Sequence, residues 1–371
     1  MGTPGAMGYG PRPQYQMTNG LDGDETDPST PDSVVDAAET LIGTESLWRG
    51  QILYTGVEVG LLDGLIDGPR EASELAEALD LDPDRTYRLL RALAYFGVVD
   101  EADLRRFSLT SVGEVFTSAH PQSVQRDLRF NWHPAWVRSM LHLPAVVEEA
   151  GPSGFVREFG RGFFEYTTEH PDFGNRYNEL MELASSDHPE QVLAAMEGYD
   201  WSRFSCVCAV GGGRGHLLCY LVNAVPGLRG IVLDRPEVVA DGAARWAHEL
   251  GVTDRVMYEG GDMFECVPEV DAYVLKWILH NWDDAACHDI LSTVHRDAPP
   301  DGRLFVIESL VPGPDTDHPS KRLDVTMMAQ VGGRERTKAE YGTLLAEAGW
   351  DLVETRALDG ASVSILEAVK A

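Results

Sequence analysis

The sequence predicts an α/β protein in which a Rossmann-like C-terminal domain follows an N-terminal, mostly α-helical winged-helix domain. The first indication is an apolar run over residues 205–210 that ends in four closely spaced glycines. The second is the alternation of strand and helix patterns from residue 201 onward, which favours a mostly parallel sheet. The third is a pair of short capped helices followed by a hairpin before residue 120.

We expect four segments along the chain. Residues 1–32 are rich in Gly, Pro, Asp and Thr and bury too little apolar surface to offset their ordering entropy, so this tail is predicted to be disordered. The winged-helix domain is expected over residues 33–120, a helical segment over 121–200, and the sheet domain over 201–371.

Two short helices with predictable ends indicate the winged helix. Ser73 is expected to cap the first, and Asp82, followed by Pro83, to cap the second, which Gly97 stops. Residues 98–110 then predict a strand and a hairpin. By itself this arrangement is typical of a DNA-binding regulator. The acidic balance of the chain favours instead a winged helix that packs a dimer, because a recognition helix needs cations around it to hold phosphates.

The chain is strongly acidic, with 60 acidic against 30 basic residues and a formal charge of −30. Only four of the basic residues are lysines: Lys276, Lys321, Lys338 and Lys370. Such a surface repels nucleic acid and anionic membranes, so we expect neither as a partner. It is also typical of proteins from salt-loving organisms, a hypothesis that an unchanged melting temperature between low and molar salt would contradict.

Length and apolar content set the class of protein. The 371 residues, 43% of them hydrophobic, suffice for substantial cores. No apolar run approaches the roughly 20 residues that cross a bilayer, and no basic segment leads into an apolar one at the N-terminus, so we expect a cytoplasmic protein. The five cysteines show no paired metal spacing. Cys206 and Cys208 alternate on a predicted strand, which favours core positions over a C-x-C metal or redox site.

The predicted helical segment over residues 121–200 is unusually aromatic. Its aromatic residues include Phe130, Trp132, Trp136, Phe155, Phe159, Phe163, Phe164, Tyr166, Phe173 and Tyr177. A helix core is the default explanation for such a set. The segment also lies between a dimerising module and a ligand-binding domain, which suits the wall of an apolar pocket.

Five strands and a terminal hairpin are expected in the sheet domain. The strands are predicted over residues 205–210, 230–233, 255–259, 271–279 and 302–310, and the hairpin strands over 351–357 and 362–369 around Asp359-Gly360. Pro236 is expected to begin a helix. Thr337 with Glu340 is expected to form the capping box of a helix that Gly349 stops.

The glycines after the first strand indicate a nucleotide site. A side chain at such a turn would collide with a ligand lying against the backbone, and glycine reaches positive φ freely. Gly211, Gly213 and Gly215 fit the pattern G-x-G-x-G, whereas the dinucleotide pattern needs a small residue where this chain has His216. The spacing favours S-adenosylmethionine (SAM), with a glycine turn in an unliganded α/β domain as the alternative.

Polar residues follow the other strands, at the edge of an open α/β sheet where ligands bind. Asp234 is placed to accept hydrogen bonds from both ribose hydroxyls of an adenosine. Asp262 can accept from the adenine amine while Met263 packs on the ring, and Trp282 is expected on the other face.

His280 follows the fourth strand and is the candidate general base. Glu308 ends the fifth strand and Glu335 precedes the last helix, and a carboxylate beside one imidazole nitrogen leaves the other free to accept a proton. Asp283 and Asp284 are expected to cap the next helix. A metal site built on His280 and Asp283 is a weaker alternative, because no other ligand cluster stands out.

Six motifs occur in one order along the chain: VGGGRG, LDRPEV, GGDMF, LKWILHNWDD, VIESLVP and GGRERTKAEYGTLLAEAGW. They resemble those of the metal-independent, SAM-dependent O-methyltransferases of the plant caffeate and bacterial polyketide type. The likeness covers about residues 35–371 and includes the dimerisation domain of that family, which implies a homodimer.

The resemblance implies roles for particular residues. It places the methionine moiety of SAM at Gly211, Gly213 and their neighbours, and it implies that Lys276 contacts the cofactor. His280 matches the general base of the family, flanked by Glu308 and Glu335. The FNW and YNELM stretches resemble those that line the acceptor pocket and point to Asn131, Tyr177 and Met181.

Two residues depart from the pattern of that family. Ala209 stands where an acidic residue is usual, and Asn281 stands where an Asp follows the base. The first departure bears on cofactor affinity or amine recognition, and the second removes a charge near the base.

These expectations combine into SAM-dependent methyl transfer to a hydroxyl of a small aromatic or polyketide-like acceptor. Ordinary pKa values of about 6.5 for His and about 10 for a phenol leave a gap that a positioned base can bridge. An alcohol nearer the value of water, roughly 15.7, leaves a far larger one. The predicted acceptor hydroxyl is therefore phenolic. The alternatives are a SAM-binding relative that performs hydroxylation or decarboxylation, and a winged-helix regulator with SAM as its effector.

Overall fold

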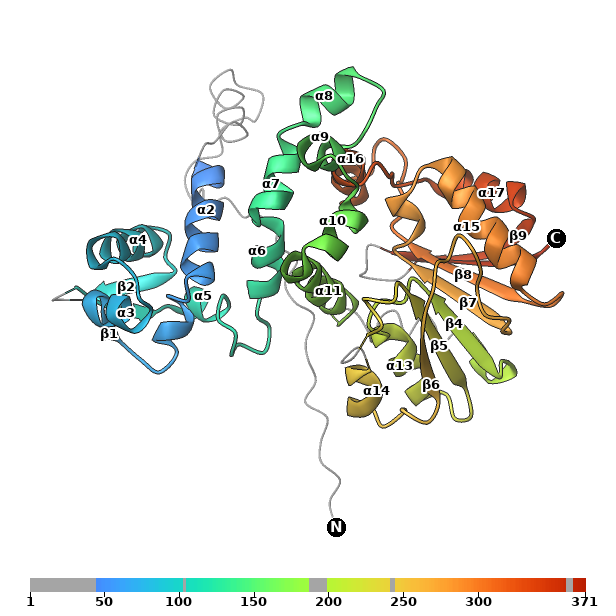
Figure 1. Cartoon of the computed structure of the whole chain (residues 1–371), viewed down its shortest axis with the longest axis horizontal. Coiled ribbons are helices and arrows are strands. Elements are labelled where there is room, and N and C mark those ends of the chain that lie inside the picture. Colours follow the sequence, from blue (N-terminus) through green and yellow to red (C-terminus); the bar gives the residue numbers. More distant parts are fainter. Residues whose placement is uncertain (1–44, 103–104, 187–198, 241–243, 358–362) are drawn as a thin grey trace, which may run out of the picture. The chain divides into compact units, whose positions relative to one another are not determined.

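The computed structural model describes residues 45–102, 105–186, 199–240, 244–357 and 363–371 (Figure 1). Residues 50–371 form one compact unit, from which the chain up to residue 49 is separate. The predicted disordered tail and the turn at Asp359-Gly360 lie outside the described residues.

The N-terminal domain contains the predicted pair of helices and the hairpin. Its elements are α2 (Glu45–Glu58), η1 (Asp63–Leu65), β1 (Arg70–Glu71), α3 (Ala72–Ala78), α4 (Pro83–Tyr95), β2 (Val99–Ala102), β3 (Arg106–Leu109) and α5 (Ser111–Glu114). The strands form an antiparallel sheet in the order β1-β3-β2, which confirms the hairpin. Asp82 caps α4 as predicted, because its side chain accepts the Arg85 N–H at 2.9 Å.

The cap predicted for α3 is wrong. This helix begins before Ser73, and its N-cap is Glu71. The Glu71 N–H donates to the Glu74 carboxylate at 3.0 Å, and the Glu71 side chain accepts in return from the backbone at Glu74. A reciprocal capping box thus satisfies two helix N–H groups and takes the role assigned to the serine.

The described part of the aromatic segment forms the helices α6 (Gln125–Asn131), α7 (Pro134–Met140), α8 (Leu143–Glu148), α9 (Gly154–Phe159), α10 (Phe163–Glu169) and α11 (Pro171–Ser186). Phe130, Phe155, Phe163 and Phe173 are buried together in one cluster. The ring of Phe130 stacks on that of Phe173 with centroids 5.4 Å apart. These four phenylalanines therefore form a helix core, as the default explanation predicted.

A seven-stranded sheet forms the C-terminal domain, with the order β6-β5-β4-β7-β8-β10-β9. Its strands are β4 (Cys206–Val210), β5 (Arg229–Asp234), β6 (Val256–Gly260), β7 (Ala272–Lys276), β8 (Arg303–Glu308), β9 (Trp350–Ala357) and β10 (Ser364–Lys370). The first five are parallel, and the terminal hairpin adds two antiparallel strands. The predicted mostly parallel sheet is confirmed.

Helices pack against this sheet through two apolar clusters. They are α13 (His216–Ala224), α14 (Arg245–Glu249), α15 (Asp284–Asp297) and α17 (Lys338–Glu347), whereas α16 (Ser320–Gln330) packs on α7, α8 and α9. One cluster joins the sheet to α15 and α17 and contains Tyr341 and Trp350, and the other joins it to α13. Cys208 is buried in the first cluster, and the neighbouring Cys206 packs against it. Among the described residues, no helix combines the length and apolar character needed to cross a membrane.

Strand register brings distant parts of the sequence together. Val210 pairs with Leu233, so the glycine turn after β4 lies beside Asp234 at the end of β5. Lys276 pairs with Ile307, so the turn after β7 lies beside Glu308 at the end of β8. The candidate residues therefore gather at the carboxyl edge of the sheet.

Two predicted elements differ from the structure. The fourth strand ends at Lys276 rather than at residue 279, because Trp277 adopts a positive φ of 55° and a 3₁₀ turn follows over Leu279–Asn281. Pro236 does not begin a helix. The N–H groups of Val238 and Val239 both donate to the Arg235 carbonyl, which closes a single turn. The capping box of Thr337 with Glu340 is confirmed.

We expect Gly154→Ala to destabilise the packing of α9. A Cβ at this position would overlap the carbonyl oxygens of Ser139 and Ala329. Overpacking of this kind lowers the free energy of unfolding by about 1–3 kcal/mol, measurable as a lower urea midpoint by circular dichroism. Gly313→Ala is the matched control, because a Cβ there meets nothing within 4 Å. Equal midpoints for the two variants would contradict the prediction.

Candidate active site

A cavity of about 580 Å³ lies at the carboxyl edge of the sheet. The glycine turn and the ends of β5, β6 and β7 form one side, and α10 and α11 contribute residues to the other. Every predicted cofactor residue lines it: Gly211, Gly213, Asp234, Asp262, Met263, Lys276 and Trp282. Of the predicted acceptor residues, Tyr177 and Met181 line the same cavity.

Asn131 is not among the residues that line this cavity. It lies on α6, where its side-chain amide donates to Asp127 Oδ1 at 3.0 Å. Its assignment to the acceptor pocket therefore stays a prediction. Phe164, from the aromatic set, and Asn178, from the YNELM stretch, also line the cavity.

The glycine turn is shaped to hold a ligand against its backbone. Gly211 and Gly213 have φ angles of 65° and 57°, which side chains rarely adopt. A Cβ at Gly213 would meet no atom within 4 Å, so the space next to this backbone is open. Asp234 braces the turn, because its two carboxylate oxygens accept the N–H groups of Gly213 and Arg235, each at 2.8 Å.

Buried charge and flat apolar surface fit an adenosyl group at this place. Burial raises the pKa of Asp234, while its two backbone hydrogen bonds lower it. Trp282 offers a fixed ring, because it stacks on Phe164 at 5.6 Å and meets Phe264 edge-on at 5.0 Å. A carboxylate and a flat aromatic surface, groups that suit a ribose and an adenine ring, thus line the same cavity.

Two further side chains of this cavity carry perturbed pKa values. Burial lowers the pKa of Lys276 to about 8, an effect that the charge of Glu308 opposes. The Lys276 Nζ lies 3.7 Å from the centroid of the Trp277 ring. Burial, and then the charge of Lys276, lowers the pKa of His216 to about 4, so this imidazole is neutral near pH 7.

His216 is a lining residue that the sequence did not assign. Its side chain is buried, and neither ring nitrogen has a hydrogen-bond partner within the described part of the chain. The sequence did contain a signal for this residue. His216 stands where the dinucleotide pattern needs a small residue, which is why the glycines fit G-x-G-x-G instead.

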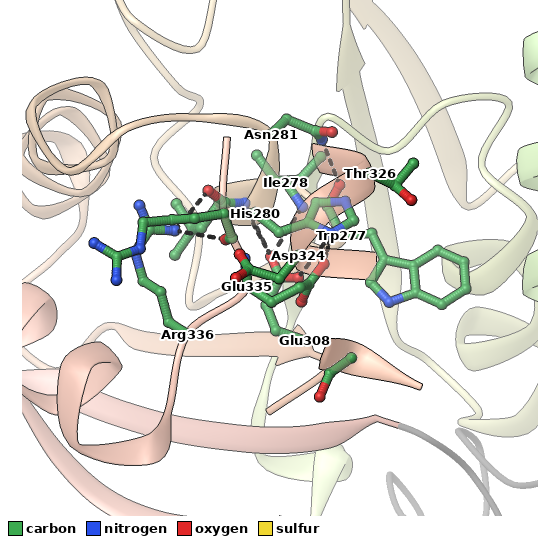
Figure 2. Close-up of polar contacts among 12 residues, drawn as sticks. Trp277, Ile278, His280, Asn281, Glu308, Asp324, Thr326, Glu335 and Arg336 are labelled. Carbon is green, nitrogen blue, oxygen red and sulfur yellow. Dashed lines mark hydrogen bonds and ion pairs between the residues drawn. The ribbon is translucent and has the colours of Figure 1, made fainter. Parts of the chain in front are cut away.

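His280, Glu308 and Glu335 meet in a buried group (Figure 2). The Nδ1 of His280 donates to Glu335 Oε1 at 2.7 Å and lies 3.9 Å from Glu308 Oε2. This hydrogen bond fixes the tautomer and leaves Nε2 with the lone pair. Burial by itself lowers the pKa of His280, but the two carboxylates outweigh it and the net shift is upward. His280 itself is not a lining residue, although its neighbours Asn281 and Trp282 are.

Glu308 holds the turn that carries the imidazole. Its Oε1 accepts the consecutive N–H groups of Ile278, Leu279 and His280 at 3.1, 2.9 and 3.4 Å. Burial raises the pKa of Glu308 to about 7, and the charge of His280 opposes this rise. The carboxyl group is thus a structural anchor as well as a charge beside the imidazole.

Arg336 holds the same turn through its carbonyl groups and was not recognised in the sequence. Its guanidinium donates to the carbonyls of Leu279 at 3.0 Å and Trp282 at 2.8 Å, and to Asp284 Oδ1 at 2.7 Å. The side chain is 1% exposed. Asp284 therefore pairs with this arginine, and Asp283 is the N-cap of α15 through the Ala286 N–H at 2.8 Å.

The loop that carries Glu335 lies directly on the His280 turn. The Arg334 N–H donates to the His280 carbonyl at 2.9 Å, and a Cβ at Gly333 would overlap that carbonyl oxygen. Asp324 on α16 accepts the Glu335 N–H at 2.9 Å. The glycine allows the close approach that brings the carboxylate to the imidazole.

The same three side chains could also hold a cation, since one ligand atom from each lies within 4.8 Å of the others. The Nδ1 of His280 is already committed to Glu335, which favours a proton-transfer role over metal ligation. Asp283 does not belong to this group of possible ligands, and its Oδ1 accepts a backbone N–H as the cap of α15.

The two departures from the family pattern have definite places. Ala209 is buried on β4 and lines the cavity. Asn281 is buried in the turn, and its side-chain amide donates to the Trp277 carbonyl at 2.9 Å. The amide therefore braces the turn where a carboxylate would add charge.

Comparison with known proteins agrees with this geometry. Residues 140–351 match the O-methyltransferase domain, and residues 44–119 match the O-methyltransferase dimerisation domain. The chain is 36% identical over 326 residues to O-demethylpuromycin-O-methyltransferase of Streptomyces alboniger, covering 86% of this chain and 85% of that protein.

Solved structures agree as well. The mitomycin 7-O-methyltransferase structure has a TM-score of 0.83 at 32% identity, covering 92% of this chain and 100% of that chain. An O-methyltransferase from neocarzinostatin biosynthesis, in complex with SAM, has a TM-score of 0.75 at 28% identity, covering 87% and 96%. This chain belongs to the family of SAM-dependent O-methyltransferases that carry a dimerisation domain.

Proposed function

We propose that this enzyme transfers the methyl group of SAM to a phenolic hydroxyl of a small aromatic acceptor, with His280 as general base. The observation that carries the proposal is the 2.7 Å hydrogen bond between His280 Nδ1 and Glu335, next to the glycine-lined cavity. The solved neocarzinostatin relative holds 2-hydroxy-5-methyl naphthoic acid, an aromatic hydroxy acid.

Particular residues hold the cofactor in this proposal. The backbone of Gly211 and Gly213 receives its methionine end, Asp234 accepts from the ribose hydroxyls, and Asp262 accepts from the adenine amine. Met263 and Trp282 enclose the adenine ring, and Lys276 contacts the same ligand. When bound, SAM supplies an electrophilic methyl group on a positively charged sulfur. The enzyme aligns the acceptor oxygen with that methyl group, and such positioning supplies roughly 7–11 kcal/mol in favourable cases.

His280 removes the hydroxyl proton, which passes to Nε2. The imidazolium that forms is stabilised by Glu335 at 2.7 Å and by the nearby Glu308. These carboxylates raise the pKa of the base towards that of a phenol, which narrows the gap in proton affinity. The difference between the pKa of His280 and that of an aliphatic alcohol stays large, so an aromatic hydroxyl is the favoured acceptor.

The acceptor site extends from the cavity wall that α10 and α11 provide. Phe164, Tyr177 and Met181 supply the apolar surface that an aromatic ring requires. We further propose a cytoplasmic homodimer. The dimerisation domain supports the dimer, and five free cysteines suit a reducing compartment.

Calorimetric titration with SAM should show one site per chain, and a panel of phenols should then release S-adenosylhomocysteine (SAH). Release of SAH separates methyl transfer from the SAM-dependent hydroxylation or decarboxylation considered above. Binding of SAM without SAH release from any phenol would argue against the acceptor class. DNA binding at physiological salt would support the regulator instead.

His280→Ala should lower the single-turnover rate of methyl transfer by about 10²- to 10⁴-fold, the usual contribution of a general base. The dissociation constant of SAM should stay unchanged, because His280 is not a lining residue of the cofactor cavity. His288→Ala is the matched control and should keep the full rate, because this half-exposed side chain on α15 does not line the cavity. Full turnover by His280→Ala would show that His280 is not the general base.

The acidic limb of the pH profile should have its midpoint above 6.5, the ordinary pKa of histidine, because the net shift of His280 is upward. The base must be neutral, so the rate falls as pH drops through this raised pKa. Glu335→Gln removes one carboxylate that raises the pKa. Its midpoint should move to lower pH while the plateau rate falls. An unchanged midpoint would remove Glu335 from the proton transfer.

A further inference from the structure

Two arginines lie next to the groups that donate to Asp234. The Gly213 N–H, directly before Arg214, donates to one carboxylate oxygen, and the N–H of Arg235 itself donates to the other. Both guanidinium groups reach away from the carboxylate, to the helices that form the opposite cavity wall. Backbone on the cofactor side is thus tied to side chains on the acceptor side.

Arg235 holds α10. Its Nη1 donates to the Phe164 carbonyl at 2.8 Å and to Thr168 Oγ1 at 2.7 Å, and its Nη2 donates to Thr167 Oγ1 at 3.4 Å. Glu237 lies 3.1 Å from Nη1 and accepts from Thr168 at 2.6 Å, which closes the network.

The Arg235 network continues into the cavity through one ring. The guanidinium carbon of Arg235 lies 5.6 Å above the Phe164 ring. That ring stacks on Trp282, the proposed adenine surface. The adenine wall and α10 are therefore in direct contact.

Arg214 holds α11 in the same way. Its Nη1 donates to Glu182 Oε1 at 3.0 Å, and its Nη2 donates to Asn175 Oδ1 at 3.1 Å. Tyr177 and Met181, which face the cavity, lie on the same helix between these contacts. Movement of the glycine turn would therefore carry this acceptor wall with it.

We propose that Arg214 and Arg235 are positioning residues that couple occupation of the cofactor site to the docking of α10 and α11. The inference rests on the proposed SAM site, because the coupling begins at Asp234 and Trp282. A ligand that binds the Asp234 carboxylate and the Trp282 ring restrains the backbone of both arginines. Each arginine passes this restraint to one helix, so bound SAM or SAH tightens the docking of the acceptor wall.

The coupling predicts a specific pattern of amide hydrogen exchange in the full-length protein with SAH as the probe. Coupling between sites is typically about 5- to 150-fold, so SAH should slow exchange in α10 and α11 of the wild type by a factor in this range. In the double variant Arg214→Gln/Arg235→Gln, the glycine turn should keep its slowing and the two helices should lose theirs.

Single variants separate coupling from general destabilisation. In Arg235→Gln, SAH should no longer slow amide exchange in α10 but should still slow it in α11. In Arg214→Gln, the effect should be lost in α11 and kept in α10. Arg356→Gln is the matched control, because Arg356 pairs with Glu354 on β9 and touches neither helix. Should Arg235→Gln fail to fold, Arg235→Lys keeps the charge and loses the forked geometry, and it should weaken the response of α10.

Three outcomes decide the matter. Slowing of both helices in the double variant, equal to that of the wild type, overturns the coupling. Slowing of the glycine turn in the wild type without any change in α10 and α11 also overturns it, while the SAM site stands. No slowing of the glycine turn in the wild type overturns the SAM site and the coupling together.

Discussion

The turn that carries His280 is held by side chains, and the position of the proposed general base depends on this. A single carboxylate oxygen of Glu308 accepts three consecutive backbone N–H groups of the turn. From the other side, the guanidinium of the buried Arg336 covers the carbonyls of Leu279 and Trp282. Backbone groups that a regular helix would satisfy internally are satisfied here by an anion and a cation. The turn can therefore be short, irregular and rigid.

The same arrangement sets the chemistry of the imidazole. Glu308 contributes one oxygen to the backbone, and its other oxygen lies 3.9 Å from His280 Nδ1. Glu335 supplies the closer contact, brought there by a loop that only a glycine at position 333 allows to approach. Burial works against a charged imidazole, and two carboxylates overcome it. A histidine whose pKa is raised suits the proposed removal of a proton from a phenol.

The aromatic segment serves both as a core and as a wall. Phe130 and Phe173 are buried inside it, whereas Phe164 and Tyr177 face the cavity. The wall is tied to the cofactor side by charge-assisted hydrogen bonds from arginines. Such bonds are strong, so they suit the proposed coupling between this wall and a bound ligand. The residues proposed for the cofactor and for the acceptor therefore line one cavity.

Local pattern in the sequence was enough to determine the order of strands and helices, the glycine turn, and the strand-end residues Asp234, Asp262 and His280. Their spacing follows from the repeat of the α/β unit, in which each strand end must reach one edge of the sheet. Contacts between distant segments could not be predicted. The end of β7 at Lys276, the pairing of Arg336 with Asp284 and the place of Asn131 outside the cavity depend on packing across more than one element. Only the tertiary structure decided them, because a hydrogen bond between residues far apart in the sequence leaves no periodic signal in either segment.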